Sequence, residues 1–101
     1  MFEPFQKFLQ RAAGQYGIAK EARAAQVCHD FRALLPELFP ERENPQEYMS
    51  PAYYRENILV INVENPAWGH EVVMRKDKII AEMNKRAGSE VIKNLRTQLK
   101  R

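Results

Sequence analysis

Residues 57–68 read NILVINVENPAW, and they join two elements of different periodicity. β-Branched residues dominate the first half, so Ile58 to Val63 is predicted to form a strand. Its apolar residues fall on both faces, so we expect both sides to be covered for most of its length. Asn65 then stands where a helix N-cap belongs, and Pro66 takes the first helical position, where its missing N–H costs nothing. The stretch therefore predicts a strand that leads directly into a helix.

The helix that starts at Pro66 is expected to continue to about Ala87, with Gly88 as its C-cap. Its apolar face would comprise Trp68, Val72, Val73, Ile79, Ile80, Met83 and Ala87. Trp68 lies at the rim of this face and is expected to belong to the core. Lys76 falls in the middle of the apolar arc, so either its methylene stem covers the core while the ammonium reaches water, or it has a specific partner.

Two helices are predicted before the central stretch. Pro4 to Gln15 has apolar residues at helical spacing, and a break bracketed by Gly14 and Gly17 follows. A second helix is expected from about Ala19 to Leu35, ended by Pro36, with Leu38 and Phe39 able to extend its apolar face. Residues 40–46 then read as a loop.

Strands are predicted on both sides of this central stretch. Glu47 to Arg55 fits a strand in which Pro51 requires an edge position or a bulge, and Glu56-Asn57 would form the turn. Val91 to Leu99 fits a strand or a basic helix, and a strand is favoured because a third strand would complete a sheet. The sequence thus predicts one α+β domain over residues 1–101, in the order α-α-β-β-α-β. Its helical part would span 4–39 and its strand-strand-helix-strand part 47–99.

Charge is distributed unevenly along the 101 residues. The net charge is +3, but residues 1–35, 36–69 and 70–101 carry +2, −4 and +5. A basic final third is typical of a protein with a polyanionic partner, although a high isoelectric point also keeps a small protein in solution. No apolar run approaches the ~18 residues of a membrane span, and the first residues lack a signal-peptide pattern. We therefore expect a cytoplasmic protein with no membrane contact.

The sequence contains none of the usual motifs for catalysis. Phosphate-binding and dinucleotide-binding glycine loops and the G-x-S-x-G elbow are all missing. Cys28-His29 is the only Cys/His pair, and one cysteine with two histidines cannot supply the four ligands of a zinc site. We therefore expect no catalytic residues, metal, cofactor or small-molecule substrate.

Basic residues are the candidates for binding a phosphate backbone. Those considered are Arg75, Lys76, Lys78, Lys85, Arg86, Lys93, Arg96, Lys100 and Arg101. Glu71→Arg75 and Glu82→Arg86 are favourable i,i+4 pairs, so a solvated, salt-bridged helix face is the competing explanation. Tyr48, Tyr53 and Tyr54 are available for base stacking, although such tyrosines also pack on sheets.

The central stretch and the helix after it resemble the DciA family of bacterial replicative-helicase loaders and operators. In that family a strand of the pattern L-x-V-x-V leads through a short polar step to a Trp, and a final strand follows a Gly. The positions in register here are Leu59, Ile61, Val63, Trp68, Glu71, Val72, Lys76, Ile79, Ile80, Met83, Asn84, Gly88, Ile92, Leu95 and Arg96. The helix before the loop is also similar, with Phe31 where a Trp is common and Leu34-Leu35 where an aliphatic pair is usual.

This resemblance implies a K-homology-like (KH-like) domain and a nucleoid-associated accessory protein of DNA replication. It implies binding to the hexameric replicative DNA helicase, assistance in loading it, and non-specific binding to single-stranded and possibly duplex DNA, without enzymatic activity. The chain lacks the GxxG loop by which true K-homology domains clamp a nucleic-acid backbone, so that binding mode is not carried over. A general RNA-binding module, or a protein-interaction domain whose acidic segment Glu37 to Glu64 meets a basic partner, remain alternatives.

Overall fold

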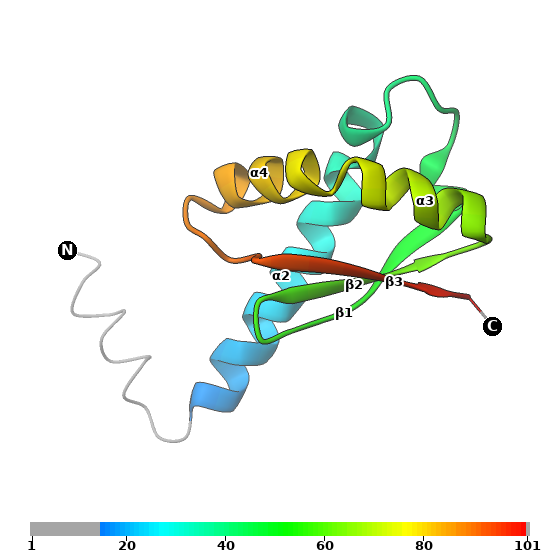
Figure 1. The fold of residues 1–101 in the computed structure, drawn as a ribbon. Coiled ribbons are helices and arrows are strands. Elements are labelled where there is room, and N and C mark those ends of the chain that lie inside the picture. Colours follow the sequence, from blue (N-terminus) through cyan, green and yellow to red (C-terminus); the bar gives the residue numbers. More distant parts are fainter. Residues whose placement is uncertain (1–14, 101) are drawn as a thin grey trace.

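The computed structural model describes residues 15–100. Its elements are α2 (Gln15–Leu38), a short 3-10 helix η1 (Pro45–Glu47), β1 (Met49–Arg55), β2 (Ile58–Val63), α3 (Pro66–Met74), α4 (Lys76–Ala87) and β3 (Asn94–Leu99) (Figure 1). The helix expected from Pro4 lies, except for Gln15, outside the described residues.

The three strands form one sheet in the order β1-β2-β3. β1 pairs with β2 antiparallel, and β3 pairs with β2 parallel. Parallel neighbours need a crossover connection, and α3 and α4 provide it. The predicted α+β class is confirmed, and the ambiguous final segment is a strand. That strand begins at Asn94, three residues later than predicted, because pairing with β2 starts there; Val91 and Ile92 are buried in the connection before it.

Strand β2 has the predicted bounds, and its two sides differ. Leu59, Ile61 and Val63 are at most 1% exposed and belong to the hydrophobic core. On the other side Val60 is also buried, whereas Ile58 is only half-buried. The expectation that both sides are covered therefore holds along the middle of the strand and weakens at its start.

Strand β1 is an edge strand with a register shift between Pro51 and Tyr53, as the proline requires. It starts at Met49, two residues later than predicted, because residues 45–47 form η1. The turn to β2 is the predicted pair Glu56-Asn57, and both residues have positive φ, 50° and 66°. Asparagine tolerates this conformation well and glutamate less so.

Helix α2 is longer than predicted at both ends. It starts at Gln15, so Gly17 lies inside the helix and the expected break at this glycine is wrong. It also continues past Pro36 to Leu38. A proline so close to the end removes a single intrahelical donor, and one further turn buries Leu38 and Phe39 at 1% and 0% exposure.

The single helix predicted from Pro66 to Ala87 is wrong, because the chain leaves helical geometry at Arg75 (φ −105°, ψ 12°). The predicted apolar face is also partly wrong. Val73 is 59% exposed and Ala87 is also exposed, although both were expected on the apolar face. Met74, just before the break, is 70% exposed. Apolar residues recur at helical spacing on both sides of Arg75, so the periodicity of the sequence does not reveal that the backbone leaves helical geometry at this residue.

The helix ends follow the predicted capping chemistry. The Asn65 side chain accepts a hydrogen bond of 3.0 Å from the Trp68 backbone N–H, with Pro66 in the first turn. Gly88 closes α4 in the left-handed conformation (φ 78°). Glycine suits this position because it has no Cβ and therefore adopts a positive φ without steric strain.

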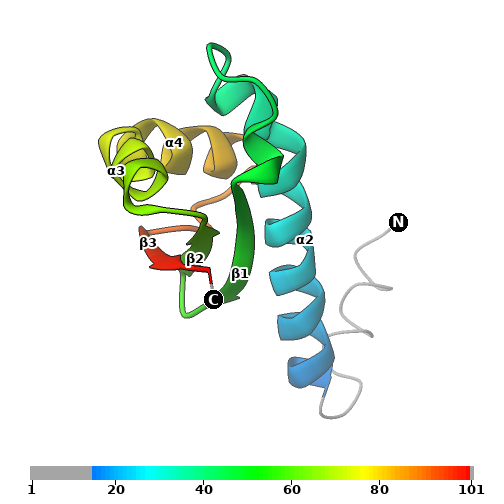
Figure 2. The same ribbon diagram turned by 90° about the vertical axis from the view of Figure 1, so that its right-hand side faces the viewer.

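The core lies between the sheet and the helices. α3 and α4 cover one face of the sheet, and α2 runs along the β1 side (Figure 2). The largest fully buried side chains come from all three layers: Phe31, Leu35, Leu38, Phe39, Leu59, Ile61, Val63, Val72, Ile79, Met83 and Ile92. Trp68 is partly buried against this cluster, as expected.

One polar clamp joins the crossover helix to the final strand. The Asn84 side chain donates to the Ile92 carbonyl at 2.9 Å and accepts from the Ile92 N–H at 2.8 Å. Ile92 is fully buried, so both of its backbone groups depend on this amide. Asn84 therefore fixes where the chain leaves α4 and enters β3.

We predict that Asn84→Ala lowers the free energy of unfolding by about 2–4 kcal/mol, because it leaves two buried backbone groups unpaired. Urea denaturation followed by circular dichroism measures the loss. Asn62→Ala is the matched control: the Asn62 side chain bonds the exposed Gln98 at 2.7 Å, and its removal should cost about 0.5 kcal/mol or less. Equal losses in the two variants would contradict the clamp.

Candidate nucleic-acid interface

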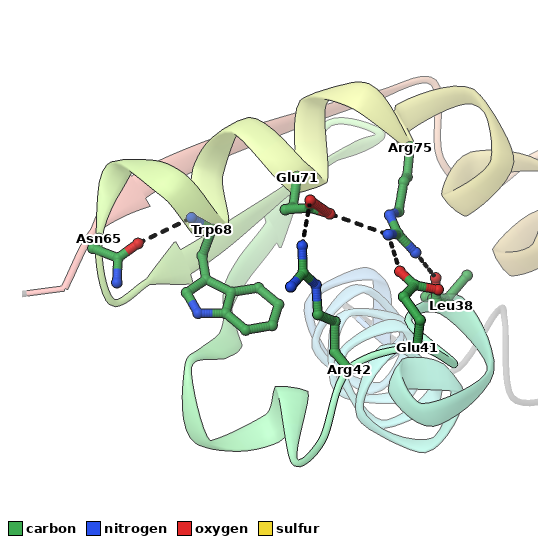
Figure 3. Close-up of polar contacts among 7 residues, drawn as sticks. All are labelled: Leu38, Glu41, Arg42, Asn65, Trp68, Glu71 and Arg75. Carbon is green, nitrogen blue, oxygen red and sulfur yellow. Dashed lines mark hydrogen bonds and ion pairs between the residues drawn. The ribbon is translucent and has the colours of Figure 1, made fainter.

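Arg75, a candidate phosphate ligand, is engaged within the protein (Figure 3). Its guanidinium donates to the Leu38 carbonyl at 3.0 Å and to Glu71 Oε2 at 3.1 Å, and it pairs with Glu41. It also lies 4.6 Å from the centre of the Phe39 ring. A cation suits this place because Leu38 ends α2, where the last carbonyls lack helical partners. The predicted Glu71→Arg75 pair is confirmed.

Glu71 joins a second arginine to this cluster. Arg42 donates to Glu71 Oε1 at 2.8 Å and lies 5.8 Å from the centre of the Trp68 ring. The hydrogen bond from Arg42 is the main cause that lowers the pKa of Glu71. The hydrogen bond from Arg75 likewise lowers the pKa of Glu41, and Glu41 in turn raises the pKa of Arg75. The cluster therefore connects α3 to the loop after α2.

Arg86 is also engaged, but its partner is not the predicted one. Its Nε lies 3.3 Å from Oδ1 of Asp30, a residue of α2 that is 7% exposed, and Glu82 is not its partner. Gln26 donates to the same Asp30 oxygen at 2.9 Å. The pair thus ties the end of α4 to α2, and an i,i+4 rule cannot anticipate a partner from another helix.

The remaining candidates fall into two separate groups. Lys78 and Lys85 are exposed and seven residues apart on α4, so they share one stripe of that helix. Arg96 and Lys100 are exposed on β3 and at its end, with Lys93 just before the strand. Lys76 is half-buried. Arg101 lies outside the described residues.

The sheet face opposite the core, here called the open face, carries a mixed row of side chains. Register places Tyr53 beside Val60 and Val60 beside Arg96, so an aromatic, an aliphatic and a cation lie in one line across the three strands. Arg55 is next along β1 on the same face and is exposed. Sequence reasoning missed Arg55, because only strand register places it on the same sheet face as Arg96, in the row of Ile58 and Asn94.

Of the three candidate tyrosines, only Tyr53 is freely presented. Tyr48 stacks on Trp68, with ring centres 5.2 Å apart and planes at 11°. Tyr54 donates its hydroxyl to the Val91 carbonyl and packs against the core. Tyr53 is 51% exposed. A single aromatic on the open face is therefore available for stacking.

A shallow groove of about 410 Å³ extends the open face toward α2. Lys20, Arg23 and Ala24 of α2 line it on one side, and Tyr53 and Arg55 on the other. The sequence offered one signal for the α2 cations, their i,i+3 spacing on one helix face, but nothing local places them beside the β1–β2 hairpin. Glu21 and Glu56 also line the groove, so its charge is mixed.

Three further properties of residues 15–100 bear on function: metal binding, the reactivity of a thiol and the capacity of a helix to span a membrane. No three His, Cys, Asp or Glu side chains there lie close enough together to hold a metal ion. Burial raises the pKa of the Cys28 thiol, which opposes formation of the reactive thiolate. No helix in this range has the length and apolar character needed to cross a bilayer.

We predict that Glu71→Gln makes the melting temperature less sensitive to acid. The carboxyl of Glu71 has a lowered pKa in the folded state, so its stabilisation is complete above the ordinary value of about 4.3 and is lost as pH falls through the folded pKa. Thermal melts between pH 7 and pH 3 measure the effect. Glu43→Gln, an exposed loop residue without an ion pair in the described part of the chain, should retain the wild-type acid sensitivity. An equally steep decline in Glu71→Gln would contradict the assignment.

No curated protein matches the chain. A family model described as "Dna[CI] antecedent, DciA" matches residues 4–97, nearly the whole chain. The family consists of helicase loaders and accessory proteins rather than enzymes, and it is associated with the replicative helicase. The match agrees with the resemblance carried by the strand-to-helix junction and the residues after it, and the chain belongs to the DciA family.

Proposed function

We propose that this protein binds the hexameric replicative DNA helicase and assists its loading onto DNA. Membership of the DciA family supports this most directly. In this proposal the protein has no catalytic activity or cofactor of its own and works through contacts to the helicase and to nucleic acid. The nucleic-acid contacts would be non-specific and made to single-stranded and possibly to duplex DNA.

The open face is the surface that best fits contact with a single strand. Arg55 and Arg96 offer exposed guanidinium groups there, and Tyr53 offers a stacking surface in the same row as Arg96 and next to Arg55 along β1. Aromatic stacking combined with a row of cations is the usual arrangement for sequence-tolerant single-strand binding. Lys100 extends the cationic row beyond the end of β3.

Arg75 and Arg86 support this proposal less than the other candidates do. Both already have carboxylate partners, and a phosphate would have to displace Glu41 and Glu71, or Asp30. Lys78 and Lys85 are exposed and make no ion pair within the described residues, but α4 carries no aromatic residue beside them. They form a second cationic stripe, which serves as an internal comparison.

A KH-like domain fits the order of elements, with two helices between the central strand and the final one. The K-homology backbone clamp does not fit, because a single residue, Arg75, joins α3 to α4 and leaves no room there for a GxxG loop. The GxxG string that the sequence does contain, Gly14 to Gly17, precedes the sheet and does not join these helices. Binding would therefore use the sheet rather than a glycine loop.

Two rival functions share parts of this surface. An RNA-binding module would use the same cations and Tyr53, and it would prefer RNA over DNA. A protein-interaction domain would use the acidic segment from Glu37 to Glu64, of which Glu41 is already paired with Arg75. The experiments below separate these functions from helicase loading.

We predict that the double variant Arg55→Ala, Arg96→Ala binds oligo-dT less tightly and with a weaker salt dependence. Two lost phosphate contacts should reduce the slope of log K against log [salt] by about 1.4, since each single-strand contact contributes about 0.7. Fluorescence anisotropy between 50 and 200 mM salt, ranges suited to such titrations, measures both quantities.

Lys78→Ala, Lys85→Ala is the matched control, with the same change of charge on a different surface. It should retain most of the wild-type affinity and slope. A flat wild-type titration, or a larger loss in the lysine control, would refute the open face as the binding surface. Tighter binding to oligo-U than to oligo-dT would favour the RNA-binding function.

We predict that the tagged protein retains the replicative helicase of its own organism from a native extract. Nuclease treatment of the extract removes bridging by DNA, so helicase that remains must be held by protein contacts. Identification of the helicase by mass spectrometry is the measurement. Its loss after nuclease treatment would leave a DNA-binding protein without the proposed partner.

A further inference from the structure

The outer edge of β3 is unpartnered in the described part of the chain. β3 pairs only with β2, and Figure 2 shows it at the side of the sheet away from α2, below α3. The Asn94 and Lys100 N–H groups point at β2, to the carbonyls of Asn57 and Val63. Because a parallel ladder alternates, the backbone groups of Thr97 and Leu99 point to the free edge.

An apolar groove lies directly beside this edge. It has a volume of about 350 Å³ and runs between α3 and β3. Val73 and Leu99, 59% and 53% exposed, line it together with Pro66, Gly69, His70 and Thr97. Val73 lines it because, contrary to the expectation from the helical pattern, its side chain is exposed and does not pack in the core.

The two sides of β3 differ in charge. Thr97 and Leu99 share the groove side, whereas Arg96 and Lys100 alternate with them on the open face; Gln98, between Thr97 and Leu99, also reaches the rim of the groove. Residues 91–101 contain four cations, Lys93, Arg96, Lys100 and Arg101, and no acid. A strand added at this edge would therefore meet apolar side chains on one side and cations on the other.

We propose that the β3 edge and the adjoining groove bind an extended segment of a partner protein in which apolar and acidic residues alternate. Main-chain hydrogen bonds to Thr97 and Leu99 would add a fourth strand, the mode known as β-augmentation. Apolar side chains of the segment enter the groove against Val73 and Leu99. Its acidic side chains face Arg96 and Lys100. This inference stands independently of the proposed nucleic-acid binding.

Two other occupants fit the surface less well. A second copy of the chain, paired antiparallel through β3, would gather Arg96 and Lys100 of both copies on one face of the joined sheet, where like charges repel. A nucleic-acid strand would need cations in the groove, and the residues that line it include no Lys or Arg. An acidic, apolar peptide is complementary to both sides.

The test uses the full chain and a ten-residue peptide of alternating valine and glutamate, with a valine–lysine peptide as the charge control. We expect saturable binding of the valine–glutamate peptide, binding at least about tenfold weaker for the lysine peptide, and slowed hydrogen exchange at the Thr97 and Leu99 amides. Tenfold corresponds to about 1.4 kcal/mol, the scale of one or two main-chain or charge-assisted hydrogen bonds.

Thr97→Pro is the decisive variant, because it removes an outward N–H without removing a bond to β2 or any charge. It should weaken peptide binding about tenfold or more, while Thr97→Val should bind like the wild type. If Thr97→Pro does not fold, the double variant Val73→Gln, Leu99→Gln, at two exposed positions, decides instead and should also weaken binding.

Several results would overturn the proposal. These are equal binding of the two peptides, wild-type peptide affinity in Thr97→Pro, or a concentration-dependent dimer that Thr97→Pro dissolves. Oligo-dT that protects the Thr97 and Leu99 amides, where the valine–glutamate peptide does not, would assign the groove to nucleic acid. Failure of this test leaves the salt-dependent binding by Arg55 and Arg96 unaffected, so the two proposals fail separately.

Discussion

The alternation of side chains along β2 is the constraint on which the rest of the structure depends. Burial of Leu59, Ile61 and Val63 on one side requires a covering layer, and α3, α4 and α2 supply it with side chains such as Val72, Ile79 and Phe31. The other side cannot be buried by the same helices, so Tyr53, Arg55 and Arg96 remain accessible around Val60. One period-two pattern thus separates the core from the candidate binding surface.

Several charges that looked free in the sequence have a structural use. Arg75 and Arg42 hold α3 against the loop that follows α2, and Arg86 holds the end of α4 against α2. These contacts join elements distant in sequence at places where the backbone is irregular or ends. A net positive charge therefore overstates the cations available to a polyanion, and the positions of the unpaired cations matter more than their number.

The fold presents two surfaces of different chemistry on either side of β3. The open face combines guanidinium groups with one exposed tyrosine, whereas the groove between α3 and β3 is apolar and lies beside a free strand edge. A protein that brings a helicase to DNA needs contacts to both protein and nucleic acid. The two surfaces meet at Arg96 and Lys100, so an acidic segment at the β3 edge and a nucleic-acid strand on the open face would compete for these two cations.

The sequence by itself determined the local features: the bounds of β2, the Asn65 and Gly88 caps, the consequence of Pro51, the Glu71–Arg75 pair and, through the residues around Trp68, the family. Each depends on neighbouring residues and on the conformations that they allow. Only the tertiary structure decided the break at Arg75, the pairing of Arg86 with Asp30, and which exposed tyrosine stacks on Trp68 and which lies on the open face. The row of Tyr53, Val60 and Arg96 across the sheet also came from strand register, which no local pattern specifies. These features depend on contacts between residues far apart in the chain, where packing outweighs local preference.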